Sequence, residues 1–232
     1  LGIKNGDEVI TVSHTAVGTI TAIEASGASP VLVDVEQDYF TLDPNKLEEV
    51  LSEKTKAIVV VHLYGFSADI TKISEICKKY NLFLIEDVSQ AHGAKWKEKR
   101  LGSLGDIGCF SCFPTKNLGA IGDAGLITTN NDEYAEKIIM LRQYGWKKRL
   151  SQIPGRNSRL DEIQASILNV KLNFNHALIY EQDIFQRGKN IGLFDVITWN
   201  IPFMFFPESE KDINLDGYGG YMGIELTLRF IS

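Results

Sequence analysis

The chain has 232 residues, a formal net charge of −6, and 44% hydrophobic and 23% charged residues. These values are typical of a globular protein and exclude a disordered chain, a collagen-like repeat and a small disulfide scaffold. The acidic balance argues against nucleic acid or an anionic membrane as a partner. Three cysteines without a pairing framework and the absence of a long apolar run lead us to predict a cytoplasmic protein.

The first two-thirds of the chain alternates strand-like with helix-like segments. Short apolar or β-branched runs predict strands at residues 8–13, 30–35, 57–61, 82–85, 107–113 and 126–129. Apolar residues at helical spacing predict helices at residues 14–26, 69–80, 131–144 and 160–172, and another that begins at Asp43-Pro44. Repeated strand–helix–strand units predict an α/β fold with a mostly parallel sheet and helices on both faces.

The last part of the chain has a different pattern. From about residue 191 the regular spacing is lost, and only residues 221–231 read as one further strand. We therefore expect a large domain over residues 1–172 and a divergent or truncated segment over residues 173–232, equivalent to an incomplete small domain.

Polar side chains gather where two of the predicted strands end. Asp87 follows the strand at 82–85, and Gln90 and His92 come soon after it. Ligands of open α/β sheets bind beyond the carboxyl ends of the strands, although an isolated Asp87 could equally be a solvated loop residue. Downstream, Ser111 is followed by Lys116 and by a stretch whose three glycines would let the backbone approach a ligand.

Five stretches of the chain occur in a distinctive order: GDEVITVSHTAVGTITAIEASGASPVLVDV, TKAIVVVHLYG, EDVSQAHGA, GCFSCFPTKNLGAIGDAGLITT and GRNSRLDEIQASIL. In content and order they resemble the DegT/DnrJ/EryC1/StrS family of sugar aminotransferases. These are fold type I enzymes that depend on pyridoxal 5′-phosphate (PLP). The resemblance covers roughly two-thirds of the chain, and five ordered motifs are far more specific than any single one.

The resemblance implies a role for each matching residue. Lys116 matches the catalytic lysine that forms a Schiff base with PLP and then serves as the base of the proton shift. A related dehydratase branch has histidine there, so Lys116 favours transamination. Asp87 matches the carboxylate that keeps the pyridine nitrogen protonated. Gln90 matches a residue near the ring hydroxyl, Ser111 a phosphate-binding hydroxyl, and Asn157 an asparagine that reaches the phosphate across a dimer interface.

Each of these residues also has a plainer interpretation. Lys116 taken alone would be a solvated surface lysine. Gln90 could be a turn amide, Ser111 a strand hydroxyl, and Asn157 the cap of the helix at 160–172. We interpret His92 as a structural histidine rather than one that touches the reacting atoms.

Other motifs suggest no second chemistry. Cys109 and Cys112 form a C-x-x-C pair that could indicate redox chemistry or half a zinc site. No second pair follows at metal spacing, so we favour two buried thiols and predict no metal site. The basic cluster at 147–149 is typical of a solvated face, although it could attract an anionic nucleotide-sugar. No dinucleotide or triphosphate fingerprint occurs.

The sequence departs from the family pattern in three places. We expect the family's N-terminal segment, with its phosphate-binding helix terminus, to be missing before Leu1. From about Asn173 the chain does not match the family's C-terminal domain. Ala16 stands where members often have an aromatic residue that stacks on the cofactor ring.

The resemblance implies a PLP-dependent aminotransferase that moves an amino group from an amino acid, with glutamate the expected donor, to a nucleotide-linked keto sugar. It also implies a homodimer. One alternative is a catalytically inactive fragment or a non-enzymatic binding protein that keeps the aminotransferase fold. Another is a PLP enzyme that acts on free amino acids.

Overall fold

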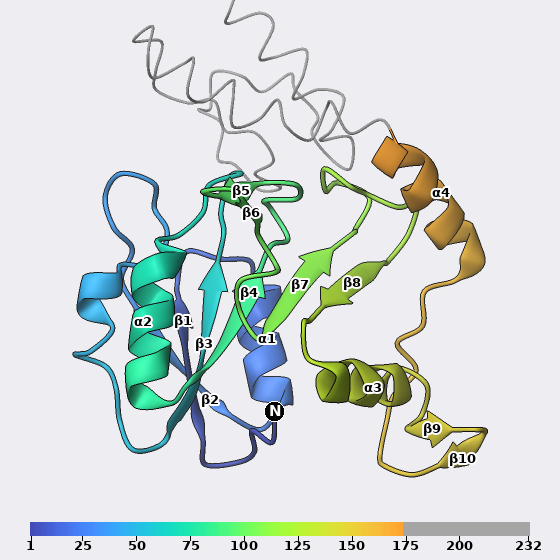
Figure 1. The fold of residues 1–232 in the computed structure, drawn as a ribbon, viewed down its shortest axis with the longest axis horizontal. Coiled ribbons are helices and arrows are strands. Elements are labelled where there is room, and N and C mark those ends of the chain that lie inside the picture. Colours follow the sequence, from blue (N-terminus) through green and yellow to red (C-terminus); the bar gives the residue numbers. More distant parts are fainter. Residues whose placement is uncertain (174–232) are drawn as a thin grey trace, which may run out of the picture.

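The computed structural model describes residues 1–173, and the predicted strand at 221–231 lies outside them. A six-stranded sheet is its centre, with the strand order β2-β1-β3-β4-β7-β8 (Figure 1). The strands are β1 (Glu8–Val12), β2 (Ser29–Val33), β3 (Thr55–Val61), β4 (Phe83–Asp87), β7 (Ile107–Ser111) and β8 (Gly125–Thr128). All neighbours pair in parallel except β7 and β8, so the predicted mostly parallel sheet is confirmed.

Helices lie on both faces of this sheet, as predicted. The helices are α1 (Val17–Ala25), α2 (Ile70–Tyr80), α3 (Asp132–Leu141) and α4 (Glu162–Asn173), of which α1 and α2 pack on opposite faces. Ile23 of α1 packs with Val9, Ala57 and Val59. The alternate strand residues Ile10, Ile58, Val60 and Leu84 pack with Ile70, Ile73 and Cys77 of α2. Because successive strand residues point to opposite faces, the apolar runs of β1 and β3 supply both layers of the core.

The helix ends follow local chemistry. The side chain of Asp69 accepts a hydrogen bond from Lys72 N over 3.1 Å and caps α2, as predicted. Helix α1 begins at Val17, later than predicted, with no side-chain cap at Ala16. Gly27 follows its end with a φ of +89°.

The prediction of a full helix beginning at Asp43-Pro44 is wrong in its length. Only a single 3₁₀ turn, η1 (Pro44–Lys46), forms there, and Asp43 caps it by accepting from Asn45 N. Leu47 is still fully buried, and Val50 and Leu51 pack against the same core. The apolar residues therefore reach the core through turns rather than along one helix face.

Two small hairpins were not predicted from the sequence. They are β5 (Lys95–Trp96) with β6 (Lys99–Arg100), and β9 (Trp146–Lys147) with β10 (Leu150–Ser151). The second turns through Lys148 and Arg149, whose φ angles are 53° and 63°. Non-glycine residues rarely adopt such angles, so the sequence carried no usual hairpin signal. Among residues 1–173 no helix is long and apolar enough to cross a membrane.

Glu86 in β4 is a fully buried carboxylate that ties the loop before β7 to the sheet. It accepts hydrogen bonds at 2.7–3.2 Å from the backbone N–H groups of Gly102, Leu104 and Gly105 and from His62 Nε2. Burial alone would raise the pKa of Glu86, but these donors outweigh it and hold the pKa below its usual value. The charge of Glu86 is therefore stabilised from all sides.

Glu86→Gln is expected to lower the free energy of unfolding by about 3 kcal/mol or more. Each carboxylate oxygen of Glu86 accepts two hydrogen bonds. The amide nitrogen of glutamine cannot accept a bond, so two of the four donors would lose their acceptor. Urea denaturation at neutral pH measures the loss, and Glu98→Gln at an exposed position of the β5–β6 turn is the matched control. Equal stabilities of the two variants would contradict this account of Glu86.

Candidate active site

The predicted site residues Asp87 and Ser111 both lie at the carboxyl edge of the sheet. Strand β4 runs on to Asp87, and its neighbour β7 ends at Ser111. The two strands are parallel, with Asp87 paired to Cys109, so the carboxyl ends of both strands lie at the same edge of the sheet. Lys116 lies on the loop that leaves β7. All three residues therefore lie at the carboxyl edge, where ligands of open α/β sheets bind.

The carboxylate of Asp87 is held at both oxygens. Ser89 N donates to Oδ1 over 3.1 Å, and Thr19 Oγ1 of helix α1 donates to Oδ2 over 2.9 Å. Sequence reasoning missed Thr19, because a threonine inside a helix carries no signal of its own. Its four-residue spacing from Thr15, which lies just before the helix that follows β1, could have pointed to it.

Ser111 and Gln90 are each fixed through a backbone group. Ser111 N donates to Ser89 Oγ over 3.2 Å, and Gln90 O accepts from Gly65 N over 2.9 Å. The Gln90 side-chain oxygen is buried, and within residues 1–173 it has no hydrogen-bond partner. A buried acceptor without a donor costs free energy, so this oxygen is suited to a hydroxyl of a bound molecule.

Lys116 is half-buried beside this cluster. Burial lowers the pKa of its amine, and the negative charge of Asp87 opposes that shift. A lowered pKa increases the share of free amine, which is the nucleophilic form. The plain interpretation of Lys116 as a fully solvated surface lysine is therefore wrong.

Gly119 closes the turn that carries Lys116. A Cβ at this position would lie 2.5 Å from Pro114 O and 2.9 Å from Lys116 O, so only glycine fits. Its carbonyl accepts from Lys171 Nζ of α4 over 2.5 Å. We predicted that this glycine-rich stretch lets the backbone approach a ligand. At Gly119 the close approach is to other backbone groups of the same turn.

His92 is buried between the same groups. Desolvation lowers the pKa of His92 to about 4, the charge of Lys116 adds to this, and the Ser111 backbone and Asp87 oppose it. The ring also packs against Phe110, with centroids 5.7 Å apart. His92 is therefore neutral at physiological pH.

Asn157 does not join the other candidate residues within the described chain. It is exposed, and its Oδ1 accepts from Arg159 Nε over 2.9 Å. Its backbone forms an isolated bridge with Gln143. Helix α4 begins only at Glu162, so Asn157 is not its cap.

The remaining motifs stay apart from this chemistry. Both Cys109 and Cys112 are free thiols, and burial raises the pKa of Cys109 to about 11. No group of three or more metal-binding side chains forms within the described residues. In the basic cluster, Lys147 lies 3.5 Å from Glu136.

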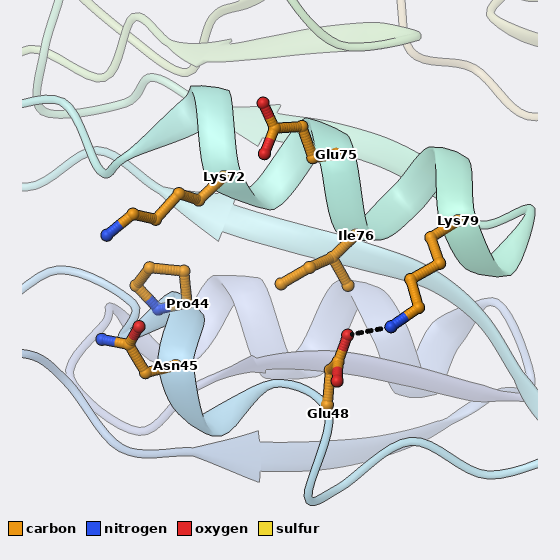
Figure 2. Close-up of a pocket in the computed structure, with 7 residues that line it drawn as sticks. All are labelled: Pro44, Asn45, Glu48, Lys72, Glu75, Ile76 and Lys79. Carbon is orange, nitrogen blue, oxygen red and sulfur yellow. Dashed lines mark hydrogen bonds and ion pairs between the residues drawn. The ribbon is translucent and has the colours of Figure 1, made fainter.

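A shallow groove lies elsewhere, between η1 and α2 (Figure 2). Two of its lysines are paired: Lys79 Nζ lies 2.8 Å from Glu48 inside the groove, and Lys72 Nζ lies 3.6 Å from Asp69, the cap of α2. The groove offers no buried reactive group, so the carboxyl edge of the sheet is the better candidate for chemistry.

Comparisons with known proteins show what the chain is similar to. The model of the DegT/DnrJ/EryC1/StrS aminotransferase family matches residues 1–187. The chain is 49% identical, over 208 residues, to dTDP-3-amino-3,6-dideoxy-alpha-D-galactopyranose transaminase of Aneurinibacillus thermoaerophilus, covering 89% of this chain and 56% of that protein. It is 50% identical, over 171 residues, to the "pleiotropic regulatory protein" of Geobacillus stearothermophilus, covering 73% and 46%.

Solved structures give the same result. The structure of S. venezuelae DesV in complex with a ketimine intermediate matches with a TM-score of 0.72 at 43% identity, covering 74% of this chain and 47% of that one. Bacillus subtilis NtdA with bound cofactor PMP matches with a TM-score of 0.69 at 35% identity, covering 82% and 46%. The fold is that of the fold type I aminotransferases, and the chain spans about half the length of these relatives.

The buried His92 should make the stability of the protein sensitive to acid. Its pKa is about 4 in the folded chain against 6.5 when unfolded, so the unfolded chain binds the extra proton in that window. The free energy of unfolding should therefore decrease as the pH is lowered. The contribution of His92 to this decrease is about 2 kcal/mol between about pH 7 and pH 5.

Urea denaturation at the two pH values measures this effect. His92→Gln should lose less stability on acidification than the wild type by about that amount. The matched control replaces an exposed histidine in the same way, His14→Gln. A His92→Gln variant with the full acid sensitivity would show that His92 is not the group responsible.

Proposed function

Since the chain belongs to the DegT/DnrJ/EryC1/StrS aminotransferase family, we propose that it transfers an amino group from an amino acid to a nucleotide-linked keto sugar. The donor proposed is glutamate, and the cofactor is PLP. The observation that carries the proposal is the half-buried amine of Lys116 within electrostatic reach of Asp87 at the carboxyl edge of the sheet. Residues 1–172 would form the cofactor-binding domain.

Lys116 would bind the cofactor covalently. Its amine must be unprotonated to attack a carbonyl carbon, and burial favours that form. The tight turn closed by Gly119 fixes the backbone from which the amine extends. The same amine would then hold and return the proton of the amino transfer.

Asp87 would face the ring nitrogen of the cofactor. Its carboxylate already accepts one bond at each oxygen, from Ser89 and Thr19, and a carboxylate can accept about four. Room therefore remains for a bond from a protonated nitrogen. When bound, PLP supplies an electron sink, which the negative charge of Asp87 supports by keeping that nitrogen protonated.

The other candidate residues fit the polar groups of PLP. The buried, unpartnered oxygen of Gln90 would accept from the ring hydroxyl, and the half-buried Ser111 would donate to the phosphate. The neutral His92 would line the pocket without adding charge. The exposed Asn157 would serve the phosphate of a neighbouring subunit rather than its own.

Relatives support the proposed substrate class. One is named a dTDP-sugar transaminase, and another, 43% identical over 197 residues, is the UDP-2-acetamido-2-deoxy-3-oxo-D-glucuronate aminotransferase of Pseudomonas aeruginosa.

A second candidate function is a binding protein without turnover. The exposed Ala16, with no ring to stack on a cofactor, favours that alternative, and one relative has a regulatory name.

Lys116→Ala should abolish covalent binding of PLP. We expect the purified wild-type protein to show a visible absorbance band with PLP that borohydride removes, and mass spectrometry to find the reduced adduct on Lys116. Lys148→Ala, in the exposed turn between β9 and β10, is the matched control and should keep the band. If the wild type and the Lys116 variant absorb alike, the assignment of Lys116 fails. If the protein neither retains PLP nor transfers an amino group from glutamate to a nucleotide-linked keto sugar, the binding protein is favoured.

A homodimer is expected in solution, with Asn157 completing the partner's site. Asn157→Ala should weaken PLP binding by about tenfold, since one hydrogen bond to a charged phosphate is lost. Mixing this variant with the Lys116→Ala variant tests the exchange between subunits. The mixed dimer has one site with both native residues, so it should recover wild-type affinity at half of its sites. Sedimentation that finds only monomer at micromolar concentration would count against the proposal.

A further inference from the structure

Two threonine hydroxyls form a directed chain that ends on Asp87. Thr19 Oγ1 lies 2.9 Å from Asp87 Oδ2, and Thr15 Oγ1 lies 2.7 Å from Thr19 Oγ1. An ionised carboxylate only accepts, so the single hydroxyl proton of Thr19 belongs to the bond with Asp87. The oxygen of Thr19 must then accept from Thr15. The chain therefore runs from Thr15 to Thr19 to Asp87.

Neither hydroxyl is used by helix α1 for its own stability. The residue before the helix is Ala16, which makes no side-chain cap, and Thr15 bonds Thr19 rather than a free backbone N–H. Thr21, on the same helix, bonds back to Val17 O and is exposed. The hydroxyls of Thr15 and Thr19 are thus committed to the carboxylate.

Burial makes the bond from Thr19 consequential. Thr19 is only 8% exposed, so water has little access to replace its donor. Hydrogen bonds in such surroundings are stronger than in water, and a donor to Thr19 polarises its O–H further. Ser89 N holds the other oxygen from the turn after β4. The carboxylate plane is therefore clamped between helix α1 and that turn.

We propose that Thr19 is a positioning residue that orients the charge of Asp87 toward the cofactor's ring nitrogen, and that Thr15 reinforces it. This inference rests on the proposed function, because that function gives Asp87 a ring nitrogen to face. It goes beyond that function by assigning part of the cofactor's protonation state to helix α1. Thr19 touches neither cofactor nor substrate and acts only through Asp87.

Thr19→Val tests the proposal, because valine keeps the shape and removes the donor. The dissociation constant of PLP should rise about tenfold or more, as expected for a lost hydrogen bond to a charged group. The nitrogen NMR shift of PLP labelled at the ring nitrogen should move toward the unprotonated value. Thr19→Ser restores the hydroxyl and should recover both properties to within about threefold. Thr15→Val should weaken PLP binding by about twofold to fivefold.

The controls separate positioning from a merely structural role. Thr21→Val, on the exposed face of α1, should leave both properties unchanged. A Thr19→Val protein that unfolds more easily but binds PLP with wild-type affinity and ring-nitrogen shift would overturn the proposal. If Thr19→Val does not fold, the Thr15→Val variant tests the proposal instead, because Thr15 is only half-buried. A wild-type ring-nitrogen shift of PLP bound to Thr15→Val would then overturn the proposal. Failure of the wild type to bind PLP would instead refute the proposed function.

Discussion

The structure depends on two successive carboxylates at the end of β4 that point to opposite faces of the sheet. Glu86 shares its face with Leu84 and the α2 layer of the core, and Asp87 faces α1. This follows from the two-residue period of a strand. A shift of register by one residue would exchange the two carboxylates and place a charge in each wrong environment. The position of β4 between β3 and β7 therefore fixes both the scaffold and the candidate site.

The candidate site is held by groups that differ in how much freedom they retain. The turn of Lys116 is closed by Gly119 and anchored by Lys171, so its backbone is fixed. Its amine takes part in no hydrogen bond or ion pair with other residues of the described chain. The burial of this amine costs free energy that Asp87 only partly offsets, which is typical of a reactive group rather than of a stabilising one.

The sequence allowed the sheet and the position of Asp87, Ser111 and Lys116 at its carboxyl edge to be predicted, for reasons that particular residues show. Buried parallel strands such as β3 are continuous apolar runs, which the sequence shows directly. Asp69 can be recognised as a helix cap because aspartate is a preferred capping residue and stands just before the apolar pattern of α2. Contacts between distant segments could not be predicted. Thr19 meets Asp87 only because α1 packs on the face of β4 that Asp87 shares, and a hydroxyl contributes nothing to hydrophobic periodicity.

The contrast between Glu86 and Asp87 distinguishes scaffold from site without reference to relatives. Both are carboxylates at the end of one strand, yet Glu86 accepts four hydrogen bonds and is fully buried, whereas Asp87 accepts two and is partly exposed. A carboxylate that only maintained the fold would gain from complete satisfaction, as Glu86 does. Asp87 is fixed in direction by two donors and keeps acceptor capacity beside Lys116. This remaining acceptor capacity is what the proposed contact between Asp87 and a cationic group requires.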